Sequence, residues 1–460
     1  MTEKIDFTWG RYPAAEDYVA ERLSATIHNM PRTGAFADAL FERTGSRLVD
    51  WVDHLVLASG DTAKGQLADL GFEPEDVPKE PGDTIYHHPG AIFPRIVLRE
   101  GTGLPQGTPL ALALQVEEIS RALMAHKIPA RIEGTPLSPY RRATLWMENG
   151  HQCIAVERRG HPGFIPTEMS LDYAHTYLQA FEQWAARPRH SADELKEMES
   201  ALGLARSLAS DLGINTAAWV AFAAERRYWQ DRNRAAQVQK AAQDSLGLGW
   251  ANHDHHTFRS SRANFPLLIQ ILETFGFKPR ERFYAGAQAG WGAQVMEQPI
   301  CRIAVFADVD LSPEEVEGDF AHRPLPIRTE LGTVGLWCAL HGDSMLSAGL
   351  HHLAGRFDFD AVTANLAARD VEMMRPFSDF SYLRQAFTRG EKWQVELQRL
   401  ERLAAAGLLS SSQKAQFLER GAIGSHLENI QRAEGFKGFN QAKISDIIRR
   451  TDPRSQVDSA

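Results

Sequence analysis

Two stretches of the chain, far apart in sequence, each carry a histidine in nearly the same context. His54 follows Asp53 in an apolar, β-branched run, and His255 follows Asp254 in a similar position. Imidazole is the commonest side-chain ligand for metal ions in proteins. Histidines at matched positions of an internal repeat can meet on a pseudo-symmetry axis. The sequence therefore predicts that His54 and His255 bind one metal ion.

The neighbouring His256 lies one residue out of this register. Successive side chains of a strand point to opposite faces, so we choose His255 and keep His256 as the alternative. Two imidazoles need a carboxylate partner to make the two-histidine, one-carboxylate face of non-haem Fe(II) oxygenases. Glu297 and Glu330 are the two candidates, and spacing alone does not separate them.

The repeat also predicts the fold. Each copy has the order histidine-bearing strand, helix, Gly-Phe turn, hairpin and a strand containing Arg-Ile. This order predicts an α+β fold whose sheet core is built from tandem βαβββ units. The expected divisions are N-terminal helices at 1–48, a first repeat at 49–105, a helical insertion at 106–248, a second repeat with the metal glutamate at 249–356, and a helical C-terminal region at 357–460.

Periodicity predicts the elements within these divisions. Helices are expected at 109–126, 169–186, 191–212, 216–243, 393–405, 411–421 and 442–450, a hairpin at 144–157, and a strand at 328–340. The doublets His87-His88 and His351-His352 are interpreted as solvated pairs at turns or helix ends, with an accessory ligand as the alternative.

Composition limits the classes of function. The 460 residues carry a net charge of −9, which argues against a partner that is nucleic acid or an anionic membrane surface. No apolar run approaches the length of a spanning helix, and the N-terminus lacks the apolar core of a signal peptide. Three scattered cysteines indicate reduced thiols rather than a disulfide framework. A cytoplasmic location is expected, and the oligomeric state is not indicated.

The motifs together resemble the vicinal-oxygen-chelate superfamily and, within it, the 2-oxoadipate dioxygenase/decarboxylase (2-hydroxyglutarate synthase) family. The stretch from His255 to Arg259 is similar to that family's His-x-Thr-x-Arg strand, and Glu330 is followed by Gly335 and Gly342 at the family's offsets. The resemblance implies His54, His255 and Glu330 as the metal ligands. Ala58 stands where the family has an arginine that holds substrate.

The resemblance implies a lysine-catabolism type of reaction. The enzyme would be an Fe(II)-dependent dioxygenase, although another divalent metal would fit the same ligands. It would take a 2-oxoadipate-like 2-oxo acid and O2 and would release CO2 and a 2-hydroxy diacid. Arg259, which shares the inward face of the strand with His255, is the first candidate to bind the distal carboxylate. Arg95 and Arg302 are second candidates.

Three other functions fit the same residues. A redox-inert metal would support a glyoxalase-type isomerase or lyase, and a different substrate would suit an aromatic-ring-cleaving dioxygenase. The third is a non-catalytic protein that binds a small ligand in the same cup.

Overall fold

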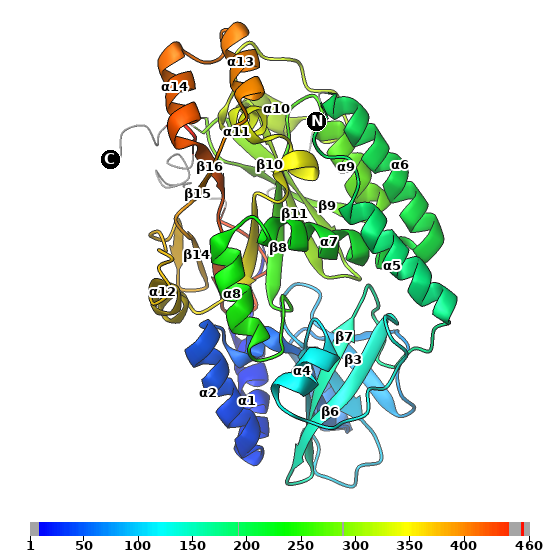
Figure 1. The fold of residues 1–460 in the computed structure, drawn as a ribbon. Helices are drawn as coiled ribbons and strands as arrows, with labels where there is room; N and C mark the ends of the chain where they lie inside the picture. The colour runs from blue at the N-terminus through cyan, green and yellow to red at the C-terminus, as the bar shows by residue number, and fades with distance from the viewer. Residues whose placement is uncertain (1–8, 192, 288, 441–451, 455–460) are drawn as a thin grey trace.

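The computed structural model describes residues 9–191, 193–287, 289–440 and 452–454. The chain forms two β-sheets with helices packed around them (Figure 1). One sheet has seven strands in the order β2-β3-β4-β1-β5-β7-β6, and the other has eight in the order β13-β14-β17-β12-β8-β11-β10-β9. Strands β15 (Glu391–Trp393) and β16 (Ala422–Ser425) pair separately.

Each sheet consists of two strand-helix-strand units joined at its centre. In the seven-stranded sheet, β1 pairs in parallel with β4 of its own unit and antiparallel with β5 of the next. The elements are β1 (Val52–Ala58), α3 (Asp61–Asp69), β2 (Glu73–Glu75), β3 (Asp83–His87) and β4 (Arg95–Arg99), then β5 (Pro109–Gln115), α4 (Ile119–Ala125), β6 (Tyr140–Glu148) and β7 (His151–Arg158).

The eight-stranded sheet repeats this plan, with β8 in the place of β1 and β12 in the place of β5. Its elements are β8 (His253–Arg259), α9 (Phe265–Thr274), β9 (Lys278–Tyr284), β10 (Trp291–Gln298) and β11 (Ile303–Asp310), then β12 (His352–Arg356), α12 (Phe359–Ala367), β13 (Ser378–Phe380), β14 (Leu383–Phe387) and β17 (Glu428–Arg432). The predicted α+β fold of tandem βαβββ units is confirmed, and this is the arrangement that the vicinal-oxygen-chelate resemblance implies.

Helices cover the outer faces of both sheets. Helices α1 (Pro13–Asn29) and α2 (Pro31–Thr44) pack beside the first sheet, and four further helices lie beside the second (Figure 1). These four are α5 (Leu171–Ala185), α6 (Glu194–Leu212), α7 (Ile214–Gln230) and α8 (Arg234–Asp244). Among the described residues, no helix combines the length and apolarity needed to span a bilayer.

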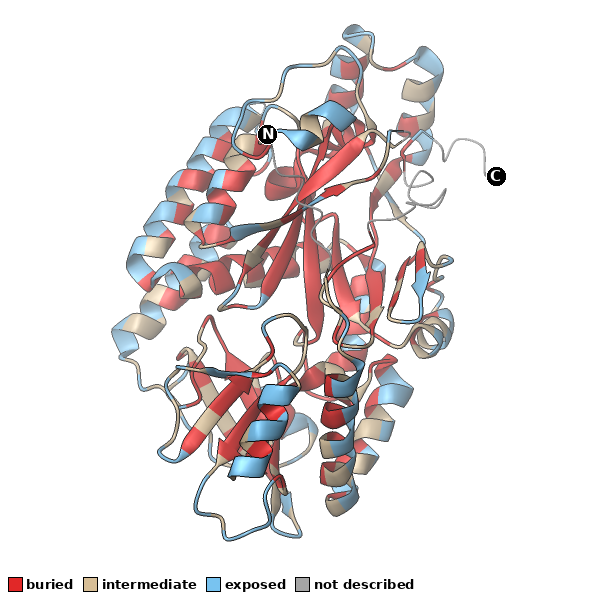
Figure 2. Cartoon of the chain, turned by 180° about the vertical axis from the view of Figure 1, so that it is seen from behind, coloured by how far each residue is buried: buried red, intermediate tan, exposed pale blue. Residues whose placement is uncertain are grey.

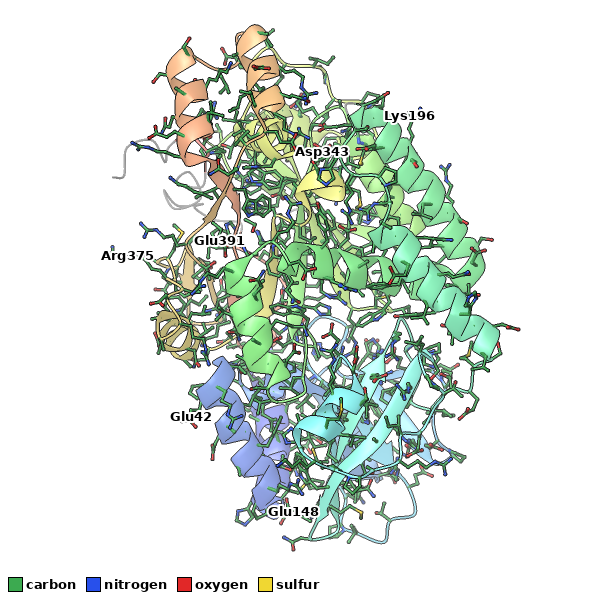
Figure 3. All side chains as sticks on the ribbon, viewed as in Figure 1. Glu42, Glu148, Lys196, Asp343, Arg375 and Glu391 are labelled. Atoms are coloured by element: carbon green, nitrogen blue, oxygen red, sulfur yellow. The ribbon has the colours of Figure 1, made fainter. Side chains whose placement is uncertain are left out.

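The most deeply buried residues lie mainly on the central strands. The central strands of both sheets are buried along nearly their whole length, whereas outer helices such as α1, α2 and α6 bury one face and expose the other (Figure 2). On β11, Val305 packs with the helix-side core, while Phe306 faces the enclosed side of the sheet with Phe283. Charged side chains such as Glu42, Lys196 and Arg375 are exposed on the outer surface (Figure 3).

Three expectations about local structure are wrong. Residues 109–126 contain strand β5 and the short helix α4, because the alternating Leu-Ala run of 110–114 fits a buried strand as well as a helix. Residues 328–340 hold no strand, and helix α11 (Thr333–His341) begins there instead. The region after 357 contributes strands β13 to β17 besides α13 (Leu397–Ala405) and α14 (Ser411–Arg420). The expected helix at 442–450 lies outside the described residues.

A buried ion pair recurs at the same place in both sheets. Asp53, which precedes His54, accepts two hydrogen bonds from Arg158 at 2.6 and 2.9 Å. Asp254, which precedes His255, accepts two from Arg432 at 2.9 and 3.0 Å. Each arginine also donates to backbone carbonyls of the segment that follows its strand. The pair therefore joins the central strand of each sheet to the last strand of the second unit.

We expect Asp53→Asn and Asp254→Asn each to lower the free energy of unfolding by about 3–5 kcal/mol, because each leaves a buried guanidinium without its counter-charge. Urea unfolding measures this. The exposed Asp69→Asn serves as the control and should change the value by less than about 0.5 kcal/mol. Equal stability of all three variants would contradict the structural role of the pairs.

Candidate metal centre

Three buried side chains of the second sheet converge on one point. Glu428 Oε2 lies 3.2 Å from His255 Nε2 and 2.9 Å from His352 Nε2. The three ligand atoms all lie within 4.8 Å of one another, and none of the three residues is more than 6% exposed. Two imidazole nitrogens and one carboxylate oxygen on one face match the ligand set of non-haem Fe(II) sites.

The strand register explains this convergence. Ala354 of β12 pairs with His255 of β8 on one side and with Glu428 of β17 on the other. His352 lies two residues before Ala354, so its side chain points to the same face. Three adjacent strands thus place the three ligand atoms together without help from a loop.

Neighbouring groups orient the three side chains. Asp254 Oδ1 lies 3.1 Å from His255 Nδ1, and His426 Nε2 lies 3.0 Å from His352 Nδ1. Gln385 donates to Glu428 Oε1 at 2.9 Å. Such outer contacts fix the tautomer and ring plane of metal-binding histidines, so both Nε2 atoms remain directed at the centre.

The electrostatics of the centre suit a cation. Burial would lower the pKa of His255, but Glu428 and Asp254 outweigh it and raise that pKa to about 9. Burial would raise the pKa of Glu428, yet His255 and His352 hold it below its usual range. The carboxylate of Glu428 is therefore ionised, and it faces the protonated imidazole of His255. A divalent metal ion can replace that proton.

The centre opens into a small pocket of about 60 Å³. The rings of Phe306 and Phe439 lie 5.1 and 4.9 Å from the ring of His255. Burial raises the pKa of Asp308, another wall residue, to about 8, and its Oδ1 atom has no hydrogen-bond partner. The remaining walls are Thr257, Phe283, Trp291, Phe377, Gln385, Phe387 and Asn440.

Only His255 of the three predicted ligands belongs to this centre. His54 lies on β1 of the other sheet and contacts Asp53 at 2.6 Å, and Glu330 is exposed in the loop before α11. Among the described residues, two groups of three potential ligands come together, and neither contains His54 or Glu330. The structure does not bring these two residues together with His255. The reason is that each repeat pairs with a second unit of its own sheet.

The other predicted residues lie outside the centre. His256 packs against Phe222 on the helix side, and Glu297 forms an ion pair with Lys437 at 2.9 Å. Arg259 is buried over the ring of Trp337 and is not among the residues that line the pocket. A role for Arg259 in substrate binding stays a prediction.

Glu428 is not among the residues that the sequence predicts for the metal site, and His352 is predicted there only as an accessory ligand. Both residues of the doublet His351-His352 are buried rather than solvated, and with His426 they form the second group of potential ligands. The signal that could have found Glu428 is its spacing from an arginine. Glu428 lies four residues before Arg432, which binds the aspartate that precedes His255.

The first sheet carries a matching position with different residues. Ala113 of β5 pairs with His54 and with Ile154, just as Ala354 pairs with His255 and Glu428. Ile154 therefore stands at the position of Glu428, and Ala111 at that of His352. His54 keeps an edge-on aromatic neighbour, Phe164, at 4.9 Å. The first half thus retains one histidine of the centre without the other two ligands.

Comparisons with known proteins give only remote similarity. No family model and no curated protein matches the chain. Similar solved structures include a mutant of 4-hydroxymandelate synthase from Streptomyces coelicolor, with 13% identity, coverage of 88% of this chain and 99% of that one, and a TM-score of 0.29. A putative hydrolase from Shewanella frigidimarina has 14% identity, coverage of 55% and 100%, and a TM-score of 0.29. A xylose isomerase-like TIM barrel/4-hydroxyphenylpyruvate dioxygenase fusion protein has 11% identity, coverage of 96% and 59%, and a TM-score of 0.25.

We expect His255→Ala, His352→Ala and Glu428→Ala each to abolish stoichiometric metal binding, because two remaining ligands make a weak site. His54→Ala is the matched control, since it removes the equivalent histidine of the first sheet and should leave binding intact. Metal analysis after anaerobic reconstitution with Fe(II) measures the stoichiometry. Loss of metal in His54→Ala with retention in His255→Ala would reverse the assignment.

Asp254→Asn should weaken metal affinity by about 10–100-fold, because the outer hydrogen bond to His255 Nδ1 is changed. Asp53→Asn breaks the equivalent ion pair in the first sheet, so it controls for the loss of stability. Competition with a chromogenic chelator gives both affinities. A similar affinity in the two variants would show that Asp254 acts on the fold alone.

Proposed function

We propose that this protein is a metal-dependent dioxygenase that acts on a small 2-oxo acid, with Fe(II) held by His255, His352 and Glu428. The observation that carries the proposal is the buried cluster of two imidazoles and one carboxylate beside a small pocket. A metal ion in this set, when bound, polarises the 2-oxo group and activates O2.

The number of ligands favours this chemistry. With only three protein ligands, a metal held by His255, His352 and Glu428 would be able to bind a substrate and O2 as well. A 2-oxo acid supplies a carboxylate and a keto oxygen with the spacing of a bidentate ligand. The chain therefore provides one face of the site and leaves the other face for the reactants.

The pocket restricts the substrate. Its volume of about 60 Å³ is far below that of ordinary ligand pockets, which hold several hundred cubic ångströms. Six aromatic rings form its walls, and the described lining contains no lysine or arginine. A buried carboxylate without a cation is costly. A short apolar tail therefore fits better than the distal carboxylate of 2-oxoadipate.

The protein groups around the pocket have separate tasks in this proposal. Phe306 and Phe439 pack against His255 and exclude water from it. Gln385 holds one oxygen of Glu428 and leaves the other for the metal. Asp308, whose raised pKa keeps it protonated at neutral pH, can donate a hydrogen bond to a substrate oxygen.

We expect the Fe(II)-loaded protein to consume O2 and to release one CO2 per O2 with 2-oxo acids that have short apolar tails. In a panel of pyruvate, 4-methyl-2-oxopentanoate, phenylpyruvate and 2-oxoadipate, kcat/KM for 4-methyl-2-oxopentanoate should exceed that for 2-oxoadipate at least about tenfold, because the latter buries an unpaired charge. An oxygen electrode measures the O2 consumed, and a CO2 assay measures the CO2 released. Glu428→Ala should be inactive and His54→Ala active.

Other outcomes identify the rival functions. O2 uptake without CO2 release, seen with catechols, would indicate a ring-cleaving dioxygenase. Turnover of a hemithioacetal with Ni(II) or Zn(II) and no O2 uptake would indicate a glyoxalase-type isomerase. Metal binding without any turnover would leave a ligand-binding protein.

A further inference from the structure

A second, much larger cavity of about 990 Å³ lies between the two sheets. Its walls come from both halves of the chain: the segment from 47 to 52 and the end of β3 on one side, and the starts of β8 and β11 on the other. None of the three residues of the metal centre lines it. Its size is at the upper end of the range for small-molecule sites.

Arg302 projects into this cavity from the turn between β10 and β11. Its backbone has a φ of 55°, a left-handed conformation that is uncommon for a bulky residue and that often marks a functional position. The side chain is exposed to the space of the cavity. No described carboxylate lies within ion-pair distance of its guanidinium, and no described acceptor takes a hydrogen bond from it.

The cations around Arg302 are already neutralised by partners of their own. Arg95 donates to both oxygens of Glu75 at 2.6 and 2.7 Å, and Arg158 is held by Asp53. Arg302 therefore adds a positive charge that the protein itself does not balance.

We propose that this cavity binds a small organic anion whose carboxylate or phosphate oxygens are held by the guanidinium of Arg302. A guanidinium donates two parallel hydrogen bonds to either group. His87, whose Nδ1 atom is buried without a partner, lines the same cavity and offers a further polar contact. Ile92, Phe93 and Ile300 give the wall an apolar surface for the body of the ligand.

This site is independent of the proposed dioxygenase function. The metal pocket and the cavity share Phe439 as a lining residue, but their polar groups differ. Binding in the cavity needs no metal ion. Anion binding in the cavity can therefore be measured on metal-free protein, in which no metal ion is present to bind the anion.

The test is isothermal titration of the full-length, chelator-treated and desalted protein with inorganic phosphate and, separately, with glutarate, at ionic strength matched by sodium chloride. We expect at least one probe to bind with a dissociation constant below about 10 mM. Arg302→Gln should weaken that binding at least about tenfold. Arg302→Lys should weaken binding to an intermediate degree, because lysine keeps the positive charge but lacks the paired hydrogen-bond donors of the guanidinium. The probe that binds tighter distinguishes a phosphate from a carboxylate ligand.

The control is Arg323→Gln, which makes the same change at an exposed arginine outside the cavity and should leave affinity unchanged. Urea unfolding confirms that the variants fold. If Arg302→Gln does not fold, the comparison uses Arg302→Lys instead. The proposal is overturned if the wild-type protein binds neither probe, or if all variants bind as the wild type does.

Discussion

The register of three adjacent strands is the constraint on which the candidate site depends. Ala354 on β12 aligns His255 and Glu428 on the strands at either side, and His352 lies one step along the same face. A slip of one residue in any of these strands would turn its ligand into the helix-side core. The ion pair between Asp254 and Arg432 ties β8 to the end of β17 and opposes such a slip.

The two sheets share one topology, and the residues that differ between them indicate which side chains belong to the candidate metal site. Both keep the aspartate-arginine pair, the histidine and its aromatic neighbour, since Asp53, Arg158, His54 and Phe164 of the first sheet make the contacts that their counterparts make in the second. The first sheet has apolar residues where the second has His352 and Glu428. The aspartate-arginine pair therefore serves the fold in both sheets, and the second sheet adds His352 and Glu428 beside its histidine.

The sequence predicted the fold class, and it selected His255 as a candidate ligand, because both inferences follow from local patterns. Strand alternation alone separated His255 from His256, and the Gly-Phe turns of the repeat marked the strand-helix-strand unit. The partners of His255 come from strands β12 and β17, far along the chain. No local pattern shows that these strands flank β8, and the visible similarity of the two histidines led instead to His54. Glu330 was predicted as a ligand because the glycines that follow it match the family's spacing. In the structure, its segment forms an exposed loop and a helix.

We expect the second sheet to hold a metal ion by itself. Anomalous diffraction from crystals grown anaerobically with Co(II) tests it most directly. We expect one strong peak about 2.0–2.2 Å from the Nε2 atoms of His255 and His352 and from an oxygen of Glu428. A peak at His54, or no peak among these three side chains, would contradict the account.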